Sequence, residues 1–346
     1  MSLLSNILFL NNQPTIHDIA KALSIDSSTV SRALNDSPRV TKHTKERILA
    51  KANELGYQRN LLALNLRKKK TNTIGVVVPR ISRYFFSSVI QGIEETTYLS
   101  GYNVIICQSL ESLDREKKII ETLAANRVDG LLISVSMETS NKEHFKVLDN
   151  NKIPYVFFDR HLNSKTDSNV LIDDFKGGFD ITEHLILRGC QKIVHFSGPL
   201  DQAIYKNRFL GYKSALNKYG IEFKQEYVLT SRLMENEGYK GVDELTKSAL
   251  VFDAIFAAND LSAIGAMKSL KEKKISIPED VAIVGFSNEP ISSVIEPSLT
   301  TIDQSGLNLG VTATNLLFKS IAEKERFKQE TIILQANLVE RDSTRK

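Results

Sequence analysis

The chain contains no tryptophan and only two cysteines and four methionines in 346 residues. Cys107 and Cys190 lie in apolar or helix-end contexts, without the spacing of a metal site or the density of a disulfide framework, so we expect reduced thiols. No run reaches the roughly 18 apolar residues that a membrane span needs. The opening MSLLSNILFL lacks a basic region and a small-residue cleavage site. These absences predict a cytoplasmic protein with no membrane partner.

Several motifs that are typical of enzymes are also missing. The chain has no dinucleotide-binding glycine fingerprint, Walker loop, zinc-type His and Cys cluster or nucleophile elbow. His184 and His195 lie within apolar helix and strand patterns, where a structural role is the simpler interpretation. Asp173, Asp174 and Asp280 follow turn signals and are interpreted as caps. We therefore expect no enzyme, no cofactor and no metal.

The residues that are present indicate a globular protein with an uneven charge distribution. Apolar residues make up 42% of the chain and charged residues 25%, and its length favours several domains over one core. Residues 1–72 hold twelve Lys and Arg against five Asp and Glu, whereas residues 73–346 hold 33 against 36. We expect the basic part to bind a polyanion and the remainder to bind a neutral or polar partner.

Two short amphipathic runs follow one another in residues 16–35, IHDIAKALSIDSSTVSRALN. The spacing of their apolar residues predicts two helices separated by the turn SID, with Asp26 capping the second helix through the N–H of Ser28 or Thr29. A third helix is predicted from about Thr41 to Leu55, with Leu49 among its inward residues and Gly56 as its stop. This is the spacing of a helix-turn-helix domain.

The polar side chains of the second run indicate a role in DNA binding. If its apolar residues face the core, then Ser27, Ser28 and Arg32 face outward near the start of a helix, where recognition helices contact the major groove. Hydroxyls can bond to bases or phosphates, and Arg32 can make a bidentate contact to guanine. The alternative is an ordinary solvated helical hairpin. The basic excess and the short turn favour DNA binding.

Residues 60–72, NLLALNLRKKKTN, predict a hinge. Ala63 and Leu66 lie three apart in about eight helix-compatible residues, too few to hold a helix alone in water. A leucine presented by such a helix is suited to opening a base step in the minor groove, while Arg67 to Lys70 contact phosphates. The alternative is a solvated linker with a lysine run.

The rest of the chain alternates short β-branched runs with helical patterns of about 12 to 16 residues. This alternation is typical of parallel, doubly wound sheets, with a ligand cleft at the carboxyl ends of the strands. The series repeats, which predicts two lobes. The predicted strands are TIGVVV, NVIIC, GLLIS, IPYVFF, NVLI, KIVHF, YVLT, DAIFAA and VAIVGF.

Polar and aromatic residues follow these strands and predict an effector cleft. A carboxylate, a guanidinium, amides and hydroxyls beside phenyl rings are suited to a sugar, because they can bond vicinal hydroxyls and cover a ring face. The alternative for each residue other than Arg208 is that it caps a helix or fills the seam between the lobes. The candidates are Phe85, Phe86, Ser134, Asp159, Arg208, Asn259, Ser287 and Gln304.

The motifs TIHDIAKALSIDSSTVSRALN, ILAKANELGYQRN and NLLALNLRKKKTNTIGVVVP resemble the headpiece, third helix and hinge of the lactose/galactose-repressor (LacI/GalR) family, and the resemblance continues along the chain. It implies a small all-α helix-turn-helix headpiece and an α/β two-lobe, periplasmic-binding-protein-like effector domain with doubly wound parallel sheets. It implies a transcriptional repressor that binds pseudo-palindromic operator DNA as a homodimer under allosteric control by a sugar effector. The matching DNA-binding positions are Thr15, Ser27, Ser28, Thr29, Arg32, Asn60, Leu66 and Arg67.

The same resemblance divides the chain and reveals departures. The expected parts are an extension (1–14), the helix-turn-helix domain (15–59), a hinge (60–72) and the effector-binding and dimerisation domain (73–346), whose lobe 1 spans about 73–172 and 306–331 and lobe 2 about 173–305 and 332–346. Ser24 replaces the family's usual glycine, Asp26 its usual serine, and Ser287-Asn288 the aspartate common after VGF. Competing hypotheses are a solute-binding protein for transport and a sugar-modifying enzyme.

Overall fold

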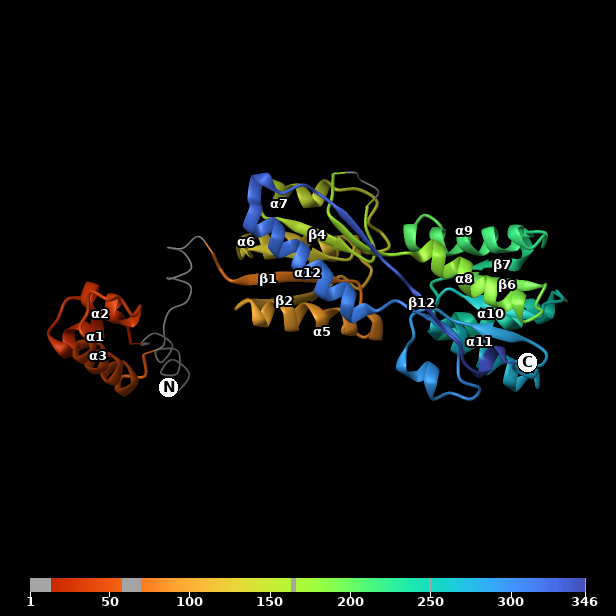
Figure 1. Cartoon of the computed structure of the whole chain (residues 1–346), viewed down its shortest axis with the longest axis horizontal. Helices are drawn as coiled ribbons and strands as arrows, with labels where there is room; N and C mark the ends of the chain where they lie inside the picture. The colour runs from red at the N-terminus through yellow and green to blue at the C-terminus, as the bar shows by residue number, and fades with distance from the viewer. Residues whose placement is uncertain (1–13, 58–69, 163–165, 249, 346) are drawn as a thin grey trace, which may run out of the picture. The chain divides into compact units, whose positions relative to one another are not determined.

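The computed structural model describes residues 14–57, 70–162, 166–248 and 250–345 (Figure 1). The expected extension over 1–14 and most of the expected hinge, including Asn60, Leu66 and Arg67, lie outside these residues apart from Pro14 and residues 70–72. Contacts divide the chain into two units, Met1–Lys69 and Lys70–Lys346. We call the described part of the first unit the headpiece and that of the second unit the effector body.

The headpiece consists of three helices around a small core. They are α1 (Ile16–Leu23), α2 (Ser27–Leu34) and α3 (Lys42–Glu54). Ile19, Val30 and Ile48 are fully buried between them. Leu49, expected to face inward, is 49% exposed, because α3 directs Ile48 and Ala52 into the core instead. The helix-turn-helix prediction is confirmed.

The turn between α1 and α2 explains one departure from the family pattern and corrects one expectation. Ser24 adopts a left-handed conformation (φ 51°, ψ 46°), which glycine enters at no steric cost. Asp26 occupies the N-cap position, but its carboxylate makes no capping hydrogen bond. Its main-chain carbonyl instead accepts from the N–H of Thr29 at 2.9 Å. At the end of α3, Gly56 (φ 66°) terminates the helix as predicted.

Lobe 1 of the effector body is a parallel sheet with helices on both faces (Figure 1). Its elements are β1 (Thr73–Val78), α5 (Tyr84–Leu99), β2 (Asn103–Gln108), α6 (Leu113–Ala125), β3 (Gly130–Ile133), α7 (Lys146–Asn150), β4 (Tyr155–Phe158), β5 (Asn169–Ile172), α12 (Gly306–Glu323) and β11 (Thr331–Leu334). The strand order is β11-β5-β4-β3-β1-β2. Along β1, Val76 and Val78 belong to the core under α5 and α12, and Val77 belongs to the core under α6.

Lobe 2 repeats this arrangement with four parallel strands. Its elements are α8 (Asp174–Leu187), β6 (Ile193–Ser197), α9 (Ala203–Lys218), β7 (Val228–Thr230), α10 (Glu235–Lys247), β8 (Ala254–Ala257), α11 (Asp260–Glu272) and β9 (Ala282–Val284). The strand order is β7-β6-β8-β9. The pair α8 and α9 packs on one face and the pair α10 and α11 on the other. Two doubly wound parallel sheets are therefore confirmed.

The chain crosses between the lobes three times, and the crossings correct the expected boundary. The antiparallel pair β10 (Thr301–Asp303) and β12 (Asn337–Val339) lies at two of them. Strand β11 pairs with β5 through Leu334, so lobe 1 extends beyond the expected residue 331. None of β10, β11 and β12 was predicted from the sequence as a strand.

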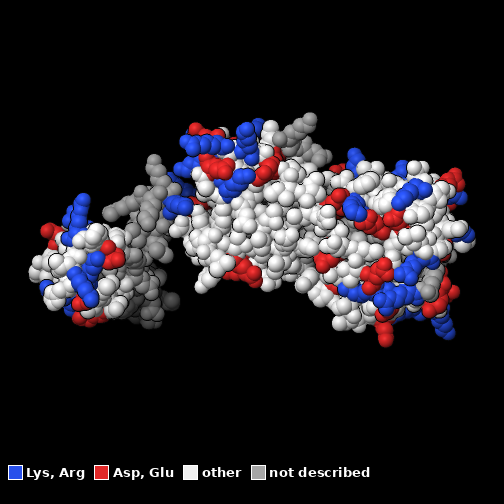
Figure 2. All heavy atoms as spheres, in the orientation of Figure 1, with Lys and Arg blue, Asp and Glu red and all other residues white. Residues whose placement is uncertain are grey.

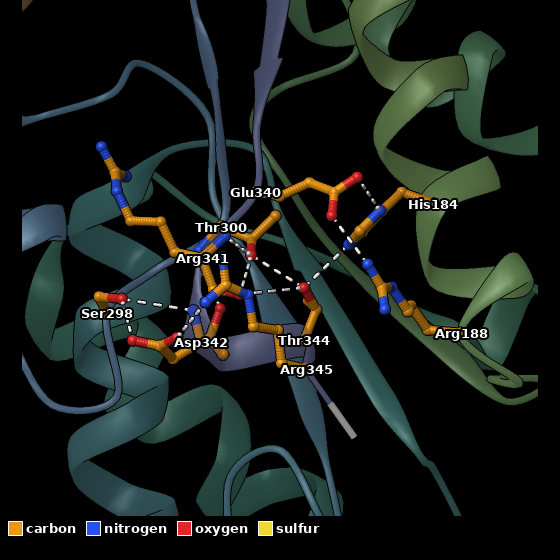
Figure 3. Close-up of polar contacts among 10 residues, drawn as sticks. His184, Arg188, Ser298, Thr300, Glu340, Arg341, Asp342, Thr344 and Arg345 are labelled. Atoms are coloured by element: carbon orange, nitrogen blue, oxygen red, sulfur yellow. Dashed lines mark hydrogen bonds and ion pairs between the residues drawn. The ribbon is translucent and has the colours of Figure 1, made fainter.

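The C-terminal segment after β12 is anchored in lobe 2 (Figure 3). The hydroxyl of Thr344 lies 2.8 Å from Nε2 of His184, and Arg188 forms an ion pair with Glu340 at 2.8 Å. Burial lowers the pKa of His184 from its usual value. His195 is also buried, with Nδ1 3.0 Å from the carbonyl of Phe256. Both histidines therefore contact structural partners.

Within the part of the chain that the structure describes, no helix is both long and apolar enough to cross a membrane. The same residues contain no group of three or more His, Cys, Asp and Glu side chains that could hold a metal ion.

Candidate functional sites

The exposed face of α2 is the candidate DNA-binding surface. Ser28 and Arg32 are exposed and lie four residues apart, so they share one face of the helix. Ser27 and Thr29 are half-buried in the first turn. Thr15 is exposed at the start of α1, where its N–H and hydroxyl donate to the carboxylate of Asp18 at 2.8 and 2.7 Å. Thr15 thus combines a capping role with an exposed position.

A cavity of about 520 Å³ lies between the two lobes of the effector body. The carboxyl ends of parallel strands border it, as the fold predicts. Two polar contacts join the lobes here: Gln202 Nε2 donates to the carbonyl of Met137 at 2.9 Å, and Arg83 Nη2 lies 3.1 Å from the sulfur of Met234. Seven of the predicted effector residues line the cavity, namely Phe85, Phe86, Asp159, Arg208, Asn259, Ser287 and Gln304.

Ser134 does not line the cavity, contrary to expectation. It is fully buried behind Asp159, and its hydroxyl donates to Oδ2 of that carboxylate at 3.4 Å. Its position after a strand end indicated the correct region, but its hydroxyl contacts Asp159, and Asp159 is the residue that lines the open space. Ser134 therefore contacts the cavity only through Asp159.

Arg208 reaches the cavity because α8 and α9 approach one another closely. A Cβ atom on Gly178 would lie 2.4 Å from the carbonyl oxygen of Arg208, and one on Gly211 would lie 2.2 Å from that of Phe175. This approach brings Arg208 Nε to 2.7 Å from Oδ1 of Asp174. Nη1 donates to the carbonyl of Ala258 at 2.7 Å. The guanidinium is therefore held in place on lobe 2 before any ligand arrives.

Asp174 was interpreted as a cap, and the structure assigns it a different role. Its carboxylate is buried beside Arg208, while Asp173 accepts the capping hydrogen bond from the N–H of Lys176 at 2.9 Å. The sequence around Asp173 and Asp174 does not show which of the two caps α8 and which pairs with Arg208. Only the packing of α8 against α9 makes that distinction.

Asp159 contributes a buried carboxylate from lobe 1. Its side chain is 5% exposed, and burial raises its pKa to about 6. Its backbone is left-handed (φ 59°), a conformation that costs energy for a residue other than glycine. A carboxylate held in this way can accept hydrogen bonds from ligand hydroxyls.

Two further cavity residues have structural constraints. Ser287 has φ 124°, a region that favours glycine, and its N–H donates to the carbonyl of Ile302 at 2.8 Å. Asn259 caps α11 by accepting from the N–H of Ser262 at 2.8 Å, and its amide donates to the carbonyl of Leu233 at 2.9 Å. Asn259 thus serves as a cap and also lines the cavity.

Several charged residues of the cavity, and Tyr205, were not predicted from the sequence. Phe85 and Asp159 were predicted because they follow strands. Their charged neighbours follow the same strands, so the same pattern could have identified them. Tyr205, one helical turn before Arg208, could likewise have been found from α9. The missed residues include Arg80, Arg83, Glu111, Arg160, Tyr205, Arg232, Glu237 and Glu289.

Comparison with known families accounts for nearly the whole chain. Residues 15–60 match the family described as "Bacterial regulatory proteins, lacI family", and residues 71–342 match "Periplasmic binding proteins and sugar binding domain of LacI family". The chain belongs to the LacI family. Its members are DNA-binding transcriptional regulators and not enzymes, so the transport and enzyme hypotheses are set aside.

Individual relatives agree with this assignment over almost their full length. The transcriptional regulator RegA of Clostridium saccharobutylicum is 30% identical, with 95% of this chain and 99% of the relative covered. The repressor PurR of Mannheimia succiniciproducens is 33% identical at 96% and 99% coverage. Catabolite control protein A of Priestia megaterium is 30% identical at 96% and 99% coverage.

Solved structures of transcriptional regulators also match this fold. The lac repressor dimer bound to operator and the anti-inducer ONPF has a TM-score of 0.85 at 25% identity, with 96% of this chain and 99% of that chain covered. The complex of the transcriptional regulator CelR with cellobiose has a TM-score of 0.73 at 27% identity, with 95% and 99% covered.

Proposed function

We propose that this LacI-family regulator represses transcription from a pseudo-palindromic operator and that a sugar in the cavity controls its affinity for DNA. The observation that carries the proposal is the cavity itself. It is large enough for a small ligand, and both Asp159 of lobe 1 and Arg208 of lobe 2, each buried, line it. A ligand that bonds both residues stabilises one arrangement of the lobes over others.

The headpiece supports the DNA-binding half of the proposal. Ser28 and Arg32 present donors and acceptors on one face of α2, as direct readout of base edges requires. We also propose that Thr15, Ser27 and Thr29 contact DNA near Ser28 and Arg32. Asn60, Leu66 and Arg67 keep their proposed roles at the minor groove and the phosphates, on the strength of the sequence alone. We also propose a cytoplasmic location, because that is where operator DNA would be bound.

The surface of lobe 1 supports assembly as a homodimer. Tyr98 and Leu99 at the end of α5 are 74% and 86% exposed, and Ile105 and Ile106 on the edge strand β2 are 39% and 40% exposed. Figure 2 shows few charged side chains over α5 and α12 in this view. A dimer would bury this apolar surface and present two headpieces to two half-sites. The lac repressor relative was solved as a dimer on operator DNA.

Selection of DNA from a random pool by the full-length chain tests the first half of this proposal. The selected duplex should contain two half-sites related by a two-fold axis. A single site or a direct repeat would contradict the homodimer. Sedimentation of the free protein provides an independent measure of the dimer.

Titration of the selected duplex by fluorescence anisotropy then tests effector control. Each sugar of a panel should be added at saturating concentration. We expect one of them to change the operator affinity by about 5- to 150-fold, the usual range of allosteric coupling. The variant Asp159→Asn should bind the same duplex without responding. If no small molecule changes the affinity, the control mechanism is wrong.

A further inference from the structure

Lobe 1 brings three guanidinium groups to the wall of the cavity. Arg80 and Arg83 lie between β1 and α5, and Arg160 follows Asp159 at the end of β4. The pKa of Arg83 is lowered, and burial is the largest cause. Glu289 opposes that effect, and the charges of Arg80 and Arg160 add to it. Arg83 therefore lies close enough to Arg80 and Arg160 to be repelled by both, and an anion would relieve that repulsion.

Arg160 has an unused donor in this cluster. The residue is 7% exposed, and its Nη1 donates to Oε2 of Glu111 at 2.8 Å. Its Nε–H is buried and finds no acceptor among the described residues. A buried donor without a partner is costly, and donors of charged groups cost most. A ligand acceptor in the cavity would remove that cost.

Arg83 also lacks a strong partner. It is half-buried at the N-cap of α5, and its Nη2 faces the sulfur of Met234, which is only a weak acceptor. Glu289 is the acidic group that acts on it, but no carboxylate among the described residues lies within 4 Å of the guanidinium. Its fork of donors matches the geometry of a carboxylate or a phosphate.

The acidic residues of the cavity offset these cations only in part. Glu111 pairs with Arg160. Glu138 accepts from the N–H of Leu113 at 2.9 Å, and Glu237 accepts from that of Met234 at 3.0 Å. These carboxylates are thereby held at helix N-termini. The cations of lobe 1 keep donors for a ligand, and Asp159 keeps an acceptor for its hydroxyls.

Building on the proposed function, we propose that the effector is an acidic sugar derivative, whose carboxylate or phosphate contacts Arg83 and the Nε–H of Arg160. Arg80 adds its charge at the same wall, and Asp159 accepts from ligand hydroxyls. The common chemistry is an anionic group on a polyhydroxylated ring. A neutral sugar would bring no charged acceptor to the fork of Arg83 or to the buried Nε–H of Arg160.

A calorimetric titration of the full-length chain with matched ligands tests this inference. The ligands are glucose, glucuronate and glucose 6-phosphate, together with galactose, galacturonate and galactose 6-phosphate. We expect an acidic member to bind at least about 100-fold more tightly than its neutral counterpart, because it gains charge-assisted hydrogen bonds. The better member of each acidic pair distinguishes a carboxylate from a phosphate. A neutral sugar that binds as tightly as its acidic counterparts would overturn the inference and leave the sugar-controlled function intact.

A second measurement does not depend on the identity of the sugar. Inorganic phosphate should raise the melting temperature of the full-length chain relative to chloride at equal ionic strength. The variant Arg83→Met should lose at least half of this gain, and so should Arg160→Lys, which keeps a charge beside Glu111. Arg326→Met, which removes an exposed arginine outside the cavity, should retain the full gain even if the headpiece also binds phosphate.

Equal gains in all four proteins would refute the anionic site whatever the titration shows. A gain that depends on Arg83, combined with no binding of any sugar, would support the anionic site and count against a sugar as the effector. The two measurements together therefore separate failure of the inference from failure of the proposed function.

Discussion

The candidate DNA-binding surface and the effector cavity place their functional groups in opposite environments. On α2 the candidates are exposed or half-buried side chains of one eight-residue helix, with Ser28 and Arg32 open to solvent. The cavity draws residues from the ends of strands and helices in both lobes, and Asp159 and Arg208 are 5% and 3% exposed. Exposed groups cost the fold little, whereas buried charges require partners or remain destabilising.

This difference means that mutations should separate function from stability in the headpiece but not in the cavity. A polar group on α2 can be changed while the three-helix core stays intact. In the cavity, the ligand-binding groups also decide how stable the effector body is without a ligand. We therefore expect large changes in stability from substitutions in the cavity and small ones from substitutions on the exposed face of α2.

Removal of Arg208 should have the largest effect. Arg208→Ala leaves the buried Asp174 carboxylate without its partner at 2.7 Å. We expect the free energy of unfolding of the effector body to fall by about 3–5 kcal/mol, measured by urea denaturation. The double variant Arg208→Met with Asp174→Asn should recover most of that loss. Equal losses in the single and double variants would show that the ion pair is not the cause.

Neutralising Asp159 should raise the free energy of unfolding of the effector body, whereas removal of Arg208 should lower it. Its folded pKa of about 6 exceeds the ordinary value of 3.8, so the native state holds this proton more tightly than the unfolded state. The stability from this group is complete below about pH 4 and is lost as the pH rises through 6. Asp159→Asn should therefore stabilise the effector body by about 3 kcal/mol at pH 7.5 and by about half of that at pH 5.

Urea denaturation at both pH values measures this effect, and effector titration of the same variant shows the functional cost. Ser134→Ala is a suitable control, because it removes the hydroxyl behind Asp159 and leaves the carboxylate in place. A destabilised Asp159→Asn protein, or a difference that does not change with pH, would mean that Asp159 is ionised and well compensated.

The same contrast explains what the sequence could predict. The nine named strands were found because they are short apolar runs, many of them β-branched, in a series that alternates with helical patterns. Strands β10, β11 and β12 pair with partners far away in the chain and lie where the chain crosses between the lobes, outside the alternating series of strands and helices. The expectation that ligands bind at the carboxyl ends of the strands located seven cavity residues. It could not predict that Asp174 pairs with Arg208, because that contact depends on how closely α8 and α9 pack at Gly178 and Gly211.

The exposed arginine of α2 should affect DNA binding without affecting the fold. Arg32→Ala should lower the affinity for the selected operator about 10- to 100-fold, as expected for the loss of a bidentate base contact. The free energy of unfolding should change by less than about 0.5 kcal/mol. Arg39→Ala removes the same charge from an exposed position outside the helices and should reduce specific and non-specific binding equally. If Arg32→Ala also weakens both equally, Arg32 contacts a phosphate and not a base.

The smallest expected effect lies in the turn of the headpiece. Ser24 has φ 51° and Gly56 has φ 66°, so both end a helix in the left-handed region. Ser24→Gly should stabilise the headpiece by about 0.5 kcal/mol, because relief of the strain exceeds the added entropy of the unfolded chain. Gly56→Ser should destabilise it by about the same amount, since a Cβ atom there meets no neighbour within 4 Å. Calorimetry of the full-length variants measures both changes. Two changes of the same sign would show that contacts, and not backbone conformation, determine the residue at these turns.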